Sequence, residues 1–99
     1  MTKPKIPIPQ DKIIRFCQEN HIVTMSLFGS VLTEQFNPNS DVDFLVEFQP
    51  EHIPTLFDVV NMEEELSRIV GRHADLKTAK GISRYFRDEV LTKAQIIYG

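Results

Sequence analysis

The chain of 99 residues contains a single cysteine, Cys17. One cysteine excludes an intrachain disulfide and a zinc cluster built from cysteines. Because Cys17 lies in an apolar helical pattern, we expect it to be a buried and inert thiol. No apolar run approaches the roughly 18 residues of a membrane-spanning helix, and the first residues lack the apolar segment of a signal peptide. These absences predict a cytoplasmic protein.

A surplus of positive charge is also lacking. Eleven Lys and Arg residues stand against 14 Asp and Glu residues, which gives a formal net charge of −3. An enzyme that grips long nucleic acid needs clustered Lys and Arg to contact phosphates, so we expect no direct nucleic-acid partner and no polymerase. One small anionic ligand held through a metal ion is still compatible with this charge. The length suits one domain with one modest core, and no repeat or low-complexity segment divides it.

The expected elements alternate between helices and strands. Three prolines among the first nine residues indicate an extended lead-in over residues 1–10, and Asp11 is the expected N-cap of the first helix. The patterns then predict a strand over 22–28, a short helix near 31–35, a strand over 41–48, a helix of about 15 residues that ends at Gly71, a strand over 73–78 and a helix capped by Ser83. Ile96-Ile97-Tyr98 is expected only as an apolar end. This order predicts an α+β or α/β layered domain, a small sheet with flanking helices.

The most informative segment joins Gly29-Ser30 to Asp41-Val42-Asp43 across ten intervening residues. Residues i and i+2 of a strand point to the same face, so the carboxylates of Asp41 and Asp43 lie side by side. Two like charges this close are costly unless a cation neutralises them, and oxygen ligands favour Mg²⁺ or Mn²⁺. The Gly-Ser pair follows a strand and is placed to open a helix whose free N–H groups accept a phosphate. Metal ligands beside a phosphate cradle predict a nucleotide site.

Each of these residues also has a purely structural interpretation. An isolated Asp-x-Asp pair is common at a solvated strand edge, although the apolar residues that follow Asp43 argue against one here. Gly29 is compatible with a simple turn, Ser30 with a helix N-cap, and Ser40 with a cap on the Asn37-Pro38-Asn39-Ser40 turn. Asp75 is expected early in the third strand, where it reaches the same cluster if that strand lies beside Asp41 and Asp43.

Other polar residues carry weaker signals. His21, His52 and His73 are scattered and lack metal-ligand spacing, so we expect surface or partly buried histidines. Glu63, Glu64 and Glu65 are expected on the wet face of the long helix, with Glu63 placed to contact the edge of the sheet.

Gly29-Ser30, the ten-residue spacer, Asp41-x-Asp43 and a later strand aspartate at Asp75 together resemble the DNA polymerase β-like nucleotidyltransferase superfamily. Residues 27–32, 41–48, 62–66 and 85–91 look still more like the minimal nucleotidyltransferase (MNT) antitoxins that accompany HEPN-domain toxins in bacteria and archaea. The resemblance runs from about Asp11 to Tyr98. It implies the fold of that superfamily and one MNT domain over residues 1–99.

The resemblance also implies a reaction. AMP would pass from ATP to a tyrosine of the HEPN toxin, an RNase that this modification silences, in a type VII-like toxin–antitoxin pair that forms a hetero-oligomer. Two Mg²⁺ ions would stabilise the attacking and leaving oxygens. The implied catalytic residues and metal ligands are Asp41, Asp43 and Asp75, and the implied nucleotide-binding residues are Gly29, Ser30 and Ser40.

One departure from the family leaves alternatives open. Many members have Arg a few residues after Gly-Ser, where this chain has Thr33 followed by Glu34. The candidate replacements for that positive charge are Lys77, Lys80, Arg84 and Arg87. The departure favours an alternative function, a catalytically weak antitoxin that neutralises its toxin by direct binding. Nucleotidyl transfer to a small molecule is a third possibility, but such enzymes generally carry a further helical domain.

Overall fold

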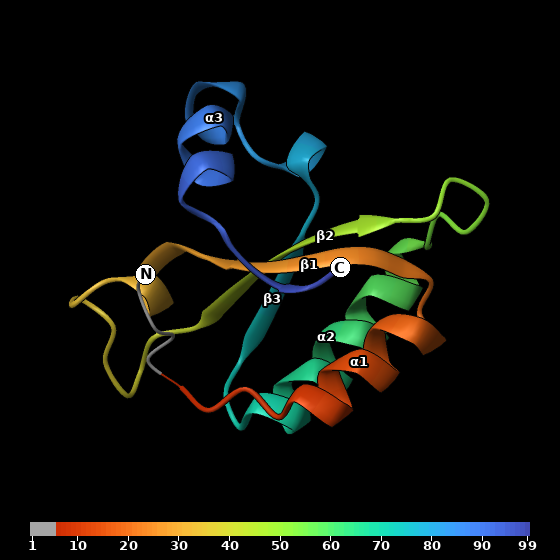
Figure 1. Cartoon of the computed structure of the whole chain (residues 1–99), viewed down its shortest axis with the longest axis horizontal. Helices are drawn as coiled ribbons and strands as arrows, with labels where there is room; N and C mark the ends of the chain where they lie inside the picture. The colour runs from red at the N-terminus through yellow and green to blue at the C-terminus, as the bar shows by residue number, and fades with distance from the viewer. Residues whose placement is uncertain (1–5) are drawn as a thin grey trace.

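Four strands form one mixed sheet in the order β3-β2-β1-β4 (Figure 1). The computed structural model describes residues 6–99, so residues 1–5 of the expected lead-in lie outside the described part of the chain. The elements are, in chain order, α1 (Gln10–Glu19), β1 (Ile22–Phe28), the 3₁₀ helix η1 (Gly29–Leu32), β2 (Val42–Phe48), α2 (Leu56–Val70), β3 (Ala74–Lys77), the 3₁₀ helix η2 (Ala79–Gly81), α3 (Arg84–Lys93) and β4 (Gln95–Tyr98).

The sheet combines both strand directions. β1 is antiparallel to β2 and to β4, whereas β3 is parallel to β2. The parallel pair is joined by a crossover through α2, as parallel neighbours require. The expected third strand therefore lies beside the strand that carries Asp43, and the predicted small mixed sheet with flanking helices is confirmed.

The helices cover both faces of the sheet. α1 and α2 lie together against one face, and α3 lies on the other (Figure 1). The main core joins Phe16 of α1 and Leu66 of α2 to Phe44 of β2, all almost completely buried. On the α3 side, a smaller cluster packs Val90 and Ala94 against Phe28 and Leu45. β2 is thus buried on both faces, as its continuous apolar run predicts.

Cys17 lies in the main core with 0% of its surface exposed. Burial raises the pKa of its thiol to about 12, because an apolar environment penalises the thiolate. The expectation of a buried thiol is confirmed.

Helix α2 begins and ends where the sequence predicts. Thr55 and Asp58 form a reciprocal capping box at its N-terminus, and Gly71 closes its C-terminus with φ +74°. Ser83 accepts a hydrogen bond from the backbone N–H of Tyr85, which confirms it as the N-cap of α3. Among the described residues, no helix is both long enough and apolar enough to cross a bilayer.

Three expectations about local structure are wrong. α1 begins at Gln10, and its N-cap is Pro9, whose carbonyl accepts the N–H of Ile13; Asp11 instead lies in the first turn, where its charge complements the helix dipole. The short helix is the 3₁₀ turn η1, which ends at Leu32 rather than extending over residues 31–35.

The third wrong expectation concerns the end of the chain. Residues expected only as an apolar end form the edge strand β4, which pairs with β1. β4 follows α3 with only Ala94 between them, so no turn signal marks its start. The free edge of β1 offers unpaired backbone N–H and C=O groups to which these residues hydrogen-bond, and that edge exists only in the assembled sheet.

Candidate functional site

The Gly-Ser segment and both acidic segments meet at one end of the sheet. β1 ends at Phe28, directly before Gly29, and its antiparallel neighbour β2 begins at Val42. β3 is parallel to β2 and therefore begins at the same end. The topology thus brings together three segments that are distant along the chain.

Gly29 lies against Asp43. Phe28 and Asp43 are opposite each other in the antiparallel register, so Gly29, the first residue after β1, lies next to the carboxylate of Asp43. Gly29 has φ +78°, and a Cβ atom built on it would lie 2.6 Å from Asp43 Oδ2. A side chain is therefore excluded both by the backbone conformation and by the space available.

Asp43 and Asp75 face each other across neighbouring strands. They are register partners in the parallel pair of β2 and β3, so their side chains share a face of the sheet. Burial raises the pKa of Asp43, and the nearby carboxylates of Asp75 and Asp41 raise it further. The positive charge of Lys77 lowers the same pKa.

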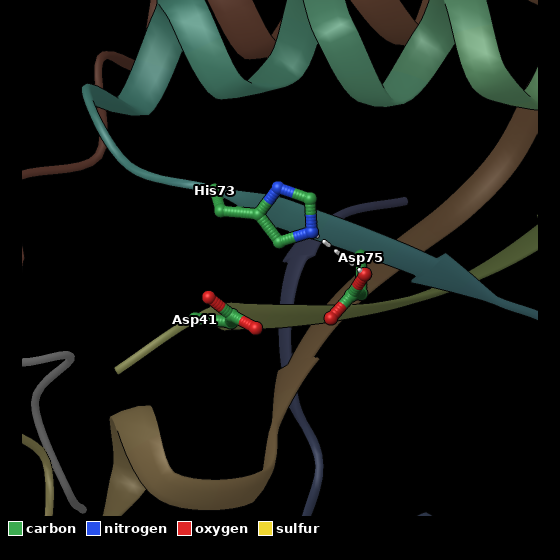
Figure 2. A group of neighbouring side chains, drawn as sticks. All are labelled: Asp41, His73 and Asp75. Carbon is green, nitrogen blue, oxygen red and sulfur yellow. Dashed lines mark hydrogen bonds and ion pairs between the residues drawn. The ribbon is translucent and has the colours of Figure 1, made fainter. Parts of the chain in front are cut away.

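Asp41 and Asp75 also meet His73 (Figure 2). One ligand atom from each of these three residues lies within 4.8 Å of the other two. His73 Nε2 lies 3.2 Å from Asp75 Oδ1, as the dashed line in Figure 2 marks. Within residues 6–99, Asp43 is not part of this close group of three.

His73 is the member of this close group that the sequence pattern does not single out. It was expected to be an ordinary surface or partly buried histidine, and it is indeed exposed. The signal that identifies it is its spacing of i and i+2 from Asp75, the same spacing that relates Asp41 to Asp43.

Helix α2 holds β3 in place through side chains. Ser67 Oγ accepts the N–H of Ala74 at 2.9 Å, and Glu63 Oε2 accepts the N–H of Leu76 at 2.8 Å. These two amides lie on the outer edge of β3, where no further strand follows. Asp75 is therefore fixed between two anchored residues, and the expected contact of Glu63 with the sheet edge is confirmed.

The turn before β2 is ordered by local hydrogen bonds. Ser40 Oγ accepts the N–H of Asn37 at 3.1 Å, which confirms Ser40 as a cap on this turn. Arg72 Nη1 donates to the carbonyl of Asn37 at 3.0 Å, and its guanidinium lies 4.5 Å from the centre of the Phe36 ring. The turn is thereby attached to the segment that leads into β3.

Another candidate cation, Arg87, contacts the backbone, and so does Thr33. Arg87 Nε donates to the carbonyl of Ala79 at 2.7 Å, and its Nη2 donates to the carbonyl of Ile82 at 3.2 Å. Arg87 is therefore engaged in fixing the backbone after β3. Thr33, which stands in place of the frequent Arg, donates its hydroxyl to the carbonyl of Ser30 at 2.9 Å.

Two cavities lie at opposite ends of β1. A cavity of about 740 Å³ opens between η1 and α3, and its walls include Gly29, Thr33 and Phe86. A cavity of about 310 Å³ lies near the start of β1, where the rings of His21 and His52 stack with centroids 3.7 Å apart. The larger cavity is next to the Gly-Ser segment, and its volume is in the range of small-molecule sites.

The family model described as polymerase beta, nucleotidyltransferase matches residues 11–99. The chain therefore belongs to the polymerase β-like nucleotidyltransferase family. It has the fold of that family, a small mixed sheet with three α-helices, and its enzymatic class is nucleotidyltransferase.

Individual similar proteins carry more specific names than the family model. A protein of Methanocaldococcus jannaschii, named by inference as a protein adenylyltransferase, is 31% identical over 83 residues, which cover 84% of this chain and 87% of the relative. Two solved structures share the fold. One is a toxin–antitoxin structure with AMP-PNP, at 22% identity and a TM-score of 0.74 over 92% of this chain and 73% of that chain. The other is a tri-AMPylated Shewanella oneidensis HEPN toxin in complex with MNT antitoxin, at 21% identity and a TM-score of 0.66 over 91% and 69%.

Proposed function

We propose that this protein is the antitoxin of a HEPN/MNT pair and that it transfers AMP from ATP to a tyrosine of its HEPN toxin. The observation that carries the proposal is the meeting of Gly29 with Asp43 and of Asp43 with Asp75 at one end of the sheet. The names of the similar proteins support the choice of AMP as the group transferred and of a toxin as the acceptor. The reaction consumes ATP, so we place it in the cytoplasm.

The donor set fits a divalent cation. The carboxylates of Asp41 and Asp75 lie in one close group with His73. Asp43 is the register partner of Asp75, and its pKa is raised in part by Asp75 and Asp41. A cation would relieve this repulsion, and carboxylate oxygens suit Mg²⁺. We propose that Asp41, Asp43 and Asp75 hold two Mg²⁺ ions. When bound, Mg²⁺ would neutralise phosphate charge and stabilise the attacking and leaving oxygens.

The residues of this chain orient the substrates. The missing side chain at Gly29 leaves room for the triphosphate to approach the backbone. Ser30 is placed beside it to donate its hydroxyl to a phosphate oxygen, and Ser40 keeps its hydroxyl proton for the same use because its oxygen accepts from Asn37. The tyrosine oxygen then attacks the α-phosphorus, and the bond to pyrophosphate breaks. Catalysis of this kind rests on positioning and charge stabilisation.

We further propose that residues 1–99 form one MNT domain. The family match begins at residue 11, and the extended lead-in ends at Pro9, directly before α1.

The test is transfer of label from α-labelled ATP to the purified cognate toxin in the presence of Mg²⁺. We expect label on the toxin with the wild type, and at least about a hundredfold less with the double variant Asp41→Asn/Asp43→Asn, because each change removes a negative ligand from the site. A matched control is Asp58→Asn, which alters a carboxylate of the α2 capping box away from the site. Absence of label on a toxin that binds the wild type would contradict the proposal.

One observation favours a second candidate, neutralisation by direct binding. Thr33 and Glu34 occupy the place of the frequent Arg, and the Thr33 hydroxyl is engaged with the backbone of η1. Co-expression of the toxin with the double variant Asp41→Ala/Asp43→Ala distinguishes the two candidates. If the variant still restores growth, binding alone is sufficient; if growth stops while the complex still forms, the chemistry is required.

A further inference from the structure

His73 lies at the mouth of the site with its distal ring nitrogen directed at the acidic group. Nε2 is 3.2 Å from Asp75 Oδ1, and Asp41 lies near them, on the residue just before β2 (Figure 2). The ligand atoms of the three residues lie within 4.8 Å of one another, which is close enough for one metal ion to be bound by all three.

The backbone holds His73 in this position. The N–H of Val42 donates to the carbonyl of His73 at 2.9 Å, which joins the entry of β3 to the entry of β2. The next residue, Ala74, is anchored to α2 through Ser67 Oγ. His73 and Asp41 each precede the first residue of their strand, so the register of the sheet brings them together.

A stabilising role explains the arrangement poorly. The side chain of His73 is 64% exposed and that of Asp75 is 33% exposed. Ion pairs and hydrogen bonds at such exposed positions contribute little to stability, because water competes with them and two side chains must be ordered. The geometry instead matches that of a ligand, an aromatic nitrogen directed into a group of carboxylates.

We propose that His73 is a nitrogen ligand of the metal site and that it shifts the site's preference from Mg²⁺ toward first-row transition ions such as Mn²⁺ and Co²⁺. Mg²⁺ prefers oxygen ligands alone, whereas imidazole binds the transition ions well. Asp41, His73 and Asp75 supply two oxygens and one nitrogen. The inference rests on the proposed metal-dependent function and adds to it the class of metal ion.

Metal binding by the full chain, without nucleotide or toxin, tests the inference. Titration with Mn²⁺, followed by the electron paramagnetic resonance signal of free Mn²⁺, gives its affinity, and competition gives that of Mg²⁺. We expect the wild type to bind Mn²⁺ at least about tenfold more tightly than Mg²⁺. His73→Ala should lower the Mn²⁺ affinity about tenfold and change the Mg²⁺ affinity less than about twofold.

Two further variants separate ligation from other effects. His52→Ala removes an exposed histidine from the far end of β1 and should leave both affinities unchanged. His73→Gln can still donate a hydrogen bond to Asp75 but is a poor ligand for transition ions, so it should behave like His73→Ala. The visible spectrum of bound Co²⁺ should change in both His73 variants. Circular dichroism should show that both variants remain folded, so that the spectral change reports the loss of a ligand.

Two results would overturn the inference. One is an unchanged Mn²⁺ preference in His73→Ala; the other is wild-type Mn²⁺ affinity in His73→Gln, which would reduce His73 to an orienting partner of Asp75. Failure of the proposed function is a separate result, because AMP transfer is measured with Mg²⁺ and toxin. If the wild type shows the expected Mn²⁺ preference but transfers no AMP to its toxin, the proposed function is contradicted and the inference about His73 is not.

Discussion

At the scale of single residues, Gly29 combines two requirements. Its φ of +78° favours glycine, and a Cβ would come within 2.6 Å of Asp43 Oδ2. We expect Gly29→Ala to lower the free energy of unfolding by about 1–2 kcal/mol and to reduce AMP transfer at least about tenfold, because Asp43 must move. Unfolding in urea and transfer of labelled AMP measure the two effects.

Gly71 is the matched control for this change. It has a similar φ of +74°, but a Cβ there would meet nothing within 4 Å. Gly71→Ala should therefore cost about 1 kcal/mol of stability through backbone strain and leave AMP transfer at the wild-type level. Equal transfer by both variants would show that the contact with Asp43 has no part in the reaction.

Cys17 predicts a pH dependence of stability. Its pKa rises from 9.0 to about 12 on burial, so the folded protein keeps the thiol proton that the unfolded chain loses above pH 9. The contribution of the Cys17 thiol to the free energy of unfolding is fully present below pH 9. It falls as pH rises toward 12, by at most about 1.4 kcal/mol per pH unit. Urea unfolding of the wild type and Cys17→Ala at pH 7, 9 and 10 measures it. An advantage of the wild type that stays constant with pH would contradict this assignment.

At the scale of elements, side chains of α2 hold β3 in place through hydrogen bonds to its backbone. Glu63 accepts the N–H of Leu76, one residue beyond Asp75. Glu63→Ala leaves this amide without its partner, so we expect a loss of about 1–2 kcal/mol of stability and weaker AMP transfer. Glu63→Gln retains an acceptor oxygen and should recover most of both.

The exposed neighbour Glu64 provides the control for α2. Glu64→Ala should change stability by less than about 0.5 kcal/mol and leave transfer intact, because within residues 6–99 its carboxylate accepts no strand amide. If Glu63→Ala behaves like Glu64→Ala in both assays, the anchoring of β3 does not depend on this carboxylate.

Elements also differ in how far the sequence predicts them. The bounds of α2 follow from its apolar spacing and from Gly71, which are local signals. The edge strand β4 carries four residues and no preceding turn signal, and it forms because β1 has a free edge. The capping prediction for Asp11 is wrong because Pro9 already ends the extended lead-in.

At the scale of the whole molecule, the proposed site exists only in the folded sheet. It draws on the end of β1 and on the starts of β2 and β3. A ligand that binds only the folded state stabilises it, by about 2.7 kcal/mol at a hundred times its dissociation constant. We therefore expect AMP-PNP with Mg²⁺ to raise the melting temperature of the wild type and to have no effect on Asp41→Asn/Asp43→Asn.

Chelation supplies the control for this last experiment. EDTA should abolish the rise in melting temperature, because the nucleotide is proposed to bind through the metal. A rise that persists in EDTA would locate nucleotide binding away from the carboxylates, for example in the cavity between η1 and α3.

The sequence by itself determined the features that depend on neighbours along the chain. The i and i+2 spacing of Asp41 and Asp43 predicts that their carboxylates lie near each other, although β2 itself begins at Val42. Gly29-Ser30 marks a turn because glycine tolerates positive φ. Only the tertiary structure decided that Asp75 faces Asp43, that His73 joins Asp41, and that Glu63 reaches the backbone of β3. These contacts depend on strand order and register, which the packing of buried side chains selects over long separations in sequence.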